Sequence, residues 1–326
     1  MLKLFKSYNP YAAILIALLA IFFKLGAFMT AMSIHTEPFQ FVWLHLSNYF
    51  NSVFGAQSYV YFIFTILNIV GQAIFLNRIA NNAHIFPKNT YLPAMTYVLL
   101  TSLMLKWNMI SAGLIGNWFM LGMLHNLLEL YLDNAPRKKL FNLGLMTSLA
   151  TLLSVSFSPL ILFIVIAVLV LRTFNITELF IILLGLIMPY YFVSSYLFLT
   201  DQWRLIPELF NYRLFSLPLF TLSLPEIIGY SVMGVLFITG LFLVNNQAQR
   251  MLFQVKKMWG VILLMSIFSI VTAIFTIMFG YQNAILMVIP ISLYITQIWF
   301  VHKPKWVASF IAFLLVAAIV FNQWFI

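Results

Sequence analysis

The chain has 326 residues, of which 63% are hydrophobic, 17% aromatic and only 7% charged. Soluble domains carry roughly a quarter charged residues, so this composition excludes an ordinary soluble enzyme and indicates one integral membrane domain over residues 1–326. The net charge of +10 does not predict a nucleic-acid partner, because the basic residues fall in short connections between apolar segments.

Apolar segments recur from one end of the chain to the other. The first follows a basic start, as in a signal peptide, but its apolar part is too long for one and it is interpreted as a retained span. Crossing a hydrocarbon core of roughly 30 Å takes about 20 helical residues. The pattern predicts an all-α bundle of about eleven spans: 10–31, 58–77, 90–105, 109–132, 141–158, 159–171, 179–199, 226–244, 260–279, 283–300 and 306–323. Residues 141–171, interrupted by "SFSP", form either two spans or one broken hairpin.

Alternate connections collect the basic residues. They hold 13 of the 17 Lys and Arg residues: Lys3, Lys6, Arg78, Lys88, Arg137, Lys138, Lys139, Arg172, Arg250, Lys256, Lys257, Lys303 and Lys305. Because cytoplasmic loops are enriched in cations, the pattern predicts a multi-pass protein with a cytoplasmic N-terminus.

Two connections on the predicted outer side are long. Residues 39–54 predict an interfacial helix, because apolar side chains recur there at helical spacing. Residues 200–225 combine aromatic side chains with Arg204, Arg213 and several prolines, which predicts an irregular segment on the outer surface.

Ionisable residues near the predicted outer face are the main candidates for function, because charge is costly to bury in a membrane. Glu37 and His35 are the candidate catalytic residues, and Lys24, Lys106, Arg204 and Arg213 are candidate phosphate- or lipid-binding residues. A carboxylate can accept a proton from a hydroxyl while cations stabilise a phosphate leaving group. The alternative is that these residues are scattered interfacial charges with snorkelling side chains.

The predicted inner face carries a second pair, His125 and Glu129, spaced four residues apart on one helix face. It predicts either a structural ion pair or a proton relay. His84 is expected in a solvated loop. No zinc motif, nucleotide-binding motif or cysteine is present, so no cofactor is predicted; a divalent metal is compatible with phosphate chemistry, but no pattern indicates one.

Three stretches together carry a resemblance: "FLNRIANNAHIFPKNTYLPAMTYVLLTSL" (75–103), "LIGNWFMLGMLHNLLELY" (114–131) and "FNLGLMTSLATLLSVSF" (141–157). The chain resembles an uncharacterised family of polytopic bacterial inner-membrane proteins, which is in turn distantly similar to GT-C membrane glycosyltransferases. That similarity implies a sugar donor linked to polyprenyl phosphate, with Glu37 as the acidic residue of the first outer loop and Arg204 or Arg213 near the donor phosphate.

Three functions remain open on the sequence. The first is a GT-C-like transferase that acts on the extracytoplasmic face, with membrane lipids as partners. The second is a non-enzymatic subunit or scaffold of an envelope complex, since a lone Glu in "IHTEPF" departs from the fuller GT-C motif. The third, a lipid flippase or transporter, is less favoured because the middle spans are almost free of ionisable residues.

Overall fold

The structure is a computed structural model that describes residues 2–6, 9, 11–29, 41–55, 58–131, 133–173, 175–210, 222–278, 283–301 and 305–324. Every regular element in these ranges is a helix, which confirms the all-α prediction. The α-helices are α1 (Leu2–Lys6), α2 (Tyr11–Met29), α3 (Phe41–Phe54), α4 (Ser58–Asn82), α5 (Leu92–Thr101), α6 (Ala112–Leu130), α7 (Arg137–Leu153), α8 (Pro159–Leu171), α9 (Ile176–Leu199), α10 (Leu224–Gln247), α11 (Phe253–Met278), α12 (Val288–Val301) and α13 (Lys305–Trp324). Short 3₁₀ segments are η1 (Leu105–Asn108), η2 (Val155–Phe157), η3 (Trp203–Phe210), η4 (Ala248–Arg250) and η5 (Asn283–Met287).

Each of the eleven predicted apolar segments contains a helix. Within the described ranges, six helical segments are long and apolar enough to cross a membrane: Tyr59–Asn82, Ile176–Leu199, Leu224–Arg250, Phe253–Thr276, Asn283–Phe300 and Trp306–Gln323. Shorter apolar helices cover Tyr11–Gly26, Leu92–Thr101 and Val155–Leu171. These lengths and compositions support a membrane protein, while the count of eleven spans and the orientation of the N-terminus stay predictions.

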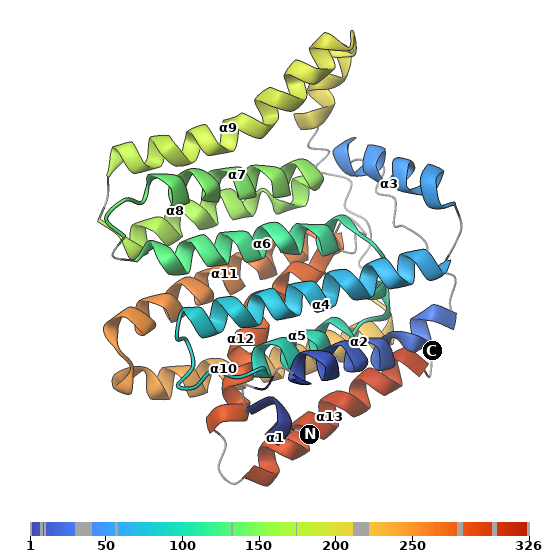
Figure 1. The fold of residues 1–326 in the computed structure, drawn as a ribbon, viewed down its shortest axis with the longest axis vertical. Coiled ribbons are helices and arrows are strands. Elements are labelled where there is room, and N and C mark those ends of the chain that lie inside the picture. Colours follow the sequence, from blue (N-terminus) through green and yellow to red (C-terminus); the bar gives the residue numbers. More distant parts are fainter. Residues whose placement is uncertain are drawn as a thin grey trace.

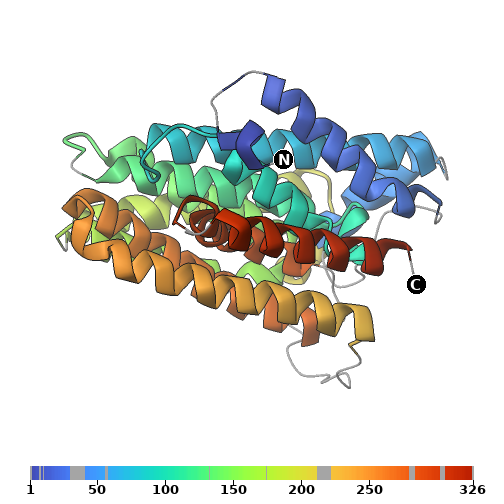
Figure 2. The ribbon, with the colours of Figure 1, turned by 90° about the horizontal axis from the view of Figure 1, so that it is seen from below.

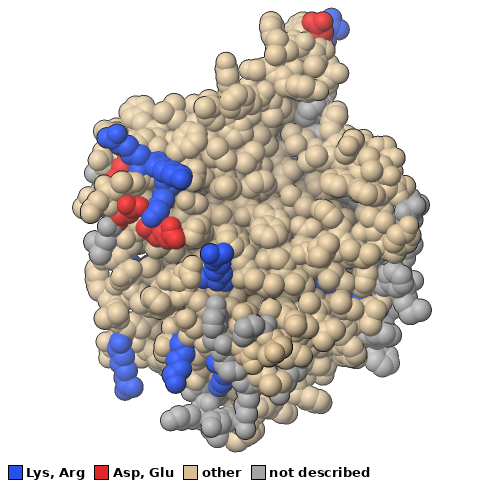
Figure 3. Space-filling view, viewed as in Figure 1, with Lys and Arg blue, Asp and Glu red and all other residues tan. Residues whose placement is uncertain are grey.

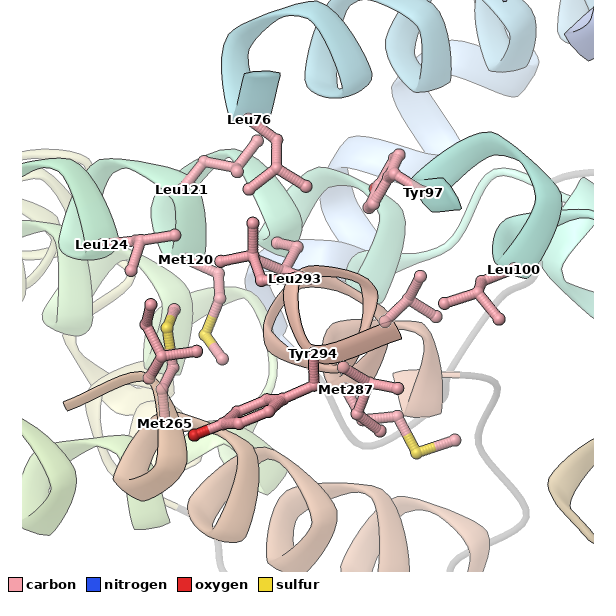
Figure 4. Packing of buried hydrophobic residues seen from close by; sticks show 14 of the residues in the cluster. Leu76, Tyr97, Leu100, Met120, Leu121, Leu124, Met265, Met287, Leu293 and Tyr294 are labelled. Carbon is pink, nitrogen blue, oxygen red and sulfur yellow. The ribbon is translucent and has the colours of Figure 1, made fainter. Parts of the chain in front are cut away.

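The long helices run in roughly one common direction, as two perpendicular views show (Figures 1 and 2). Helix α12 crosses the middle of this bundle obliquely (Figure 1) and contacts α5, α6, α10 and α11. The segment Asn283–Phe300 is the most completely buried of the six candidate spans. The core around it includes Leu, Met and Tyr side chains from α4, α5, α6, α11, η5 and α12, among them Tyr294 (Figure 4).

The chain between residues 141 and 171 forms two helices. Helix α7 ends at Leu153, η2 follows, and α8 begins at Pro159, whose fixed φ and missing N–H suit the first turn of a helix. The two helices contact one another and are joined by only a few residues. The "SFSP" interruption therefore separates two helices. Neither helix is among the six segments long and apolar enough to span a membrane, and the choice between two spans and one broken hairpin stays a prediction.

The two long connections are described in part. Helix α3 lies within the segment predicted as an interfacial helix, with Trp43 buried and Leu46, Tyr49 and Val53 exposed. Its position at a membrane surface stays a prediction. The segment predicted at 200–225 contains η3, and its residues 211–221 lie outside the described residues.

Basic residues gather at one end of the bundle, called here the basic end, which is formed by the C-terminal ends of α4, α6, α8 and α10 and the N-terminal ends of α7 and α11. Lys139 and Arg172 both contact Asp133, and Lys257 lies over the ring of Tyr131. Figure 3 shows blue side chains along this side and a small charged group at the tip beyond α9, while most of the visible face is uncharged. The opposite end contains the C-terminal ends of α2, α5 and α13 and the N-terminal ends of α6 and α10.

Candidate functional site

Lys24 is the most unusual charged residue in the described part of the chain. It lies in α2 near its C-terminal end, and its side chain is completely buried, with 0% exposed. Its Nζ donates to the backbone oxygen of Thr101 at 3.1 Å and to Oδ1 of Asn108 at 2.5 Å. Among the described residues no carboxylate lies within ion-pair distance of it. A cation at this depth is therefore held by neutral oxygen atoms.

The partners of Lys24 belong to a buried polar network at the end of α5. Asn108 donates through Nδ2 to Oε1 of Gln323 at 3.0 Å, and Gln323 donates through Nε2 to the oxygen of Ser102 at 2.8 Å. The neighbouring Asn322 donates to the oxygen of Leu103 at 3.0 Å. The network thus joins α2, α13 and the connection between α5 and α6.

The local reason for this network is the early end of α5. This helix has only 10 residues, and the last carbonyl groups of a helix have no partner within it. Three consecutive carbonyls, those of residues 101–103, each accept a hydrogen bond from a side chain of α2 or α13. A lysine at this position also interacts favourably with the negative end of the α5 dipole.

Lys106 lies in η1, two residues before Asn108, but it has a different partner. Its Nζ forms an ion pair of 2.5 Å with Oε1 of Glu226, and its side chain is 53% exposed. Glu226 also accepts hydrogen bonds from the backbone N–H and the hydroxyl of Ser223, closing a capping box at the start of α10. Lys24 and Lys106 are therefore at the same end of the bundle, one buried and one exposed.

Of the remaining predicted site residues, only Arg204 is among the described residues, and it is not brought to this network. Arg204 is exposed in η3, where its guanidinium lies 5.8 Å from the centroid of the Trp203 ring. Segment η3 packs against α9 and α3, whereas α2 packs against α4, α5, α13 and η1 (Figure 1). His35, Glu37 and Arg213 lie outside the described residues.

The predicted inner pair forms at the basic end. Nδ1 of His125 lies 3.6 Å from Oε1 of Glu129, and Lys139 contacts both Glu129 and Asp133. His84, His125, Glu129 and Lys139 are among the residues that line a pocket of about 280 Å³. The pKa of Asp133 is lowered by the hydrogen bond from Lys139 and by the backbone N–H of Ala135. The contacts to Lys139 favour the structural interpretation of the pair over a proton relay.

In the part of the chain that the structure describes, no group of three His, Cys, Asp or Glu side chains could hold a metal ion. The sequence predicted the cations of the site but not the residues that bind them. Asn108 and Gln323 were missed because neutral amides carry no charge signal, and Glu226 was missed because it lies far from Lys106 along the chain. The only hint is that "NQW" ends an otherwise apolar final helix.

Comparisons with protein families, with curated proteins and with solved structures find no match to this chain. The resemblance to polytopic inner-membrane proteins and to GT-C enzymes therefore stays a prediction from sequence.

Proposed function

We propose that this chain is a multispan protein of the bacterial inner membrane that binds a polyprenyl-phosphate-linked sugar at the end of the bundle that contains Lys24. In this proposal it transfers the sugar to an acceptor hydroxyl, as GT-C enzymes do. The observation that carries the proposal is the buried position of Lys24 with only neutral partners among the described residues.

An ammonium group has three N–H donors, and two of those of Lys24 have partners in the described structure. A phosphate oxygen is a suitable third partner, because charge-assisted hydrogen bonds between a cation and phosphate are among the strongest in proteins. Lys106 is more exposed and lies at the same end. It would then bind the phosphate of the approaching sugar donor in place of its ion pair with Glu226.

Glu37 supplies the base in this proposal. It follows Met29, the last residue of α2, by eight positions, and eight extended residues reach at most about 28 Å. Its carboxylate would accept the proton of the acceptor hydroxyl. The hydroxyl oxygen would bond to the anomeric carbon as the bond from that carbon to the phosphate oxygen breaks, and the phosphate would leave with the electron pair, facing Lys24.

A second candidate is a non-enzymatic subunit of an envelope complex. It is favoured by the hydrogen bond from Lys24 to the end of α5 and by the ion pair between Lys106 and Glu226, because both give the cations structural roles. Under this alternative the polar network stabilises the short helix α5 and no substrate is needed.

The two candidates are separated by comparing Lys24→Gln and Glu37→Gln with Lys138→Gln, a matched loss of charge at the basic end. We expect the purified wild-type protein to retain polyprenyl-phosphate lipid, measured by mass spectrometry. Lys24→Gln should reduce the retained lipid by about tenfold or more. Glu37→Gln should retain the lipid but abolish the glycan product in cells, and Lys138→Gln should change neither.

The transferase proposal fails if the purified wild-type protein carries no such lipid. It also fails if Lys24→Gln and Glu37→Gln both restore a deletion strain to wild-type growth and glycan content. That second result would favour the scaffold, because Lys24→Gln keeps a hydrogen-bond donor for the end of α5 and removes only the charge that transfer requires.

A further inference from the structure

A second pocket lies at the basic end, away from the Lys24 network. Its volume is about 430 Å³, and its walls come from the turn after α4, the end of α10, η4, the start of α11 and α12. His84, Arg250, Gln247 and Gln297 provide its polar groups, and the rest of the lining, including Phe86 and Val255, is apolar. The pocket is therefore amphipathic.

Among the described residues, no carboxylate lines this pocket, although the neighbouring pocket of about 280 Å³, which shares His84, contains Glu129. All of its lining residues come from two stretches, 38–128 and 227–326, that contain no Asp or Glu in the sequence. Arg250 is exposed, and the ion pairs among the described residues do not include it. Lys88 and Lys256, each next to a lining residue in the chain, add to the positive charge. The pocket thus favours an anion.

Two carboxamides at the inner wall are incompletely bonded. Gln297 is 2% exposed, and its Nε2 donates to Oε1 of Gln247 at 2.6 Å. Oε1 of Gln297 is buried and has no hydrogen-bond partner among the described residues. A buried carboxamide oxygen without a donor is unfavourable. A hydroxyl group of a ligand both donates and accepts hydrogen bonds. It would supply the missing donor for this pair of carboxamides.

The edge of the pocket is apolar and open. Leu252, which lines it, is 77% exposed, and the adjacent Phe253 is 67% exposed. Large exposed apolar side chains beside a cationic pocket are suited to the junction between lipid headgroups and acyl chains. A soluble anion would gain nothing from them, so the lining favours a lipid over a free phosphate.

We propose that this pocket binds an anionic phospholipid with a hydroxyl-bearing headgroup, such as phosphatidylglycerol. The phosphodiester lies against Arg250 and His84, the headgroup hydroxyls bond to Gln247 and Gln297, and an acyl chain follows Leu252. Basic pockets between membrane helices commonly hold anionic headgroups on the cytoplasmic side, which is the side predicted for the basic end. The site does not depend on the transferase proposal.

The test uses the full chain purified in detergent and titrated with phosphatidylglycerol, phosphatidic acid and phosphatidylcholine of the same acyl composition, with binding measured by native mass spectrometry. We expect phosphatidylglycerol to bind at least tenfold more tightly than phosphatidylcholine. Arg250→Gln should lower the affinity for phosphatidylglycerol about tenfold. Lys138→Gln, which removes an exposed cation at the same end outside the pocket, should leave the affinity unchanged. Gln247→Leu should reduce the preference for phosphatidylglycerol over phosphatidic acid.

The proposal is overturned if Arg250→Gln and Lys138→Gln lower binding equally, because the attraction would then be a general effect of charge. Equal binding of phosphatidylglycerol and phosphatidylcholine would also overturn it. A further titration adds glycerol 1-phosphate as a competitor of phosphatidylglycerol. Complete displacement of the lipid at equal concentration would show a soluble phosphate site instead of a lipid site. A Gln247→Leu variant with unchanged headgroup preference would remove the role given to the two carboxamides.

Discussion

Single residues show what the sequence could and could not predict about the candidate site. The sequence identified Lys24 as an unusual cation, because it lies within an apolar segment. It could not predict the environment of Lys24, since Asn108 is 84 positions away and Gln323 lies a further 215 positions along the chain. Such partners are brought together only by helix packing. The ion pair of Lys106 with Glu226 was missed for the same reason.

Asp133 carries a pH-dependent contribution to stability. Its pKa in the folded protein is lowered by Lys139 and by the N–H of Ala135, which bond to its carboxylate at 2.7 and 2.9 Å. A lowered pKa means that the contribution is complete above the ordinary aspartate pKa of about 3.9 and is lost as the pH falls through the folded value. We expect Asp133→Asn to lower the melting temperature at pH 7 and to differ less from wild type as the pH falls below about 4.

The measurement is thermal unfolding of the detergent-solubilised protein at several pH values. Asp201→Asn is the matched control, because Asp201 is exposed and forms no ion pair among the described residues. An Asp133→Asn deficit that stays constant from pH 7 to pH 3 would contradict the role given to the carboxylate charge.

At the scale of helices, α7 and α9 pack through a pair of glycines. A Cβ added to Gly144 would collide with the backbone oxygen of Ile182, and one added to Gly185 would collide with the backbone oxygen of Phe141. Both obstacles are backbone atoms, which cannot rotate away. Small residues that allow close backbone approach are typical of helix pairs in membranes. The contact fixes α9, which is otherwise mostly exposed, to the bundle.

Gly144→Ala should therefore destabilise the protein although alanine is the better helix former. We expect a loss of about 1–3 kcal/mol, as for other overpacked sites, seen as a lower melting temperature. Gly234→Ala is the control, because nothing lies within 4 Å of the added Cβ in α10. It should be neutral or stabilise by up to about 1 kcal/mol. Equal effects of the two substitutions would show that α7 and α9 do not approach so closely.

The existence of the helices was readable from apolar runs, and the break between α7 and α8 was readable from Ser and Pro in "SFSP". The apolar runs did not predict which of these helices would be buried. Helices α5 and α9 are both apolar on most faces, yet all ten residues of α5 are buried and α9 is largely exposed. Because lipid and protein interior are equally apolar, a hydrophobic pattern cannot tell which helix lies at the centre.

At the scale of the whole molecule, the two ends of the bundle differ in chemistry. The basic end combines several cations, some of them in ion pairs, with two pockets, while the opposite end contains a buried lysine among amides and backbone oxygens. The sequence predicted the basic end from the alternation of basic connections, but it did not predict the amides around Lys24. The structure brings most of those connections to one end, but which side of the membrane that end faces stays a prediction.

The absence of cysteine makes this orientation directly testable, because any introduced thiol is unique. Asn134→Cys lies in the exposed connection between α6 and α7 at the basic end, and Gln202→Cys lies in the exposed turn after α9 at the opposite end. A membrane-impermeant maleimide added to intact cells should label Gln202→Cys and leave Asn134→Cys unlabelled until the membrane is permeabilised. Labelling of Asn134→Cys alone in intact cells would invert the topology and move Lys24 and Glu37 to the cytoplasmic side, where polyprenyl-linked transfer on the outer face could not occur.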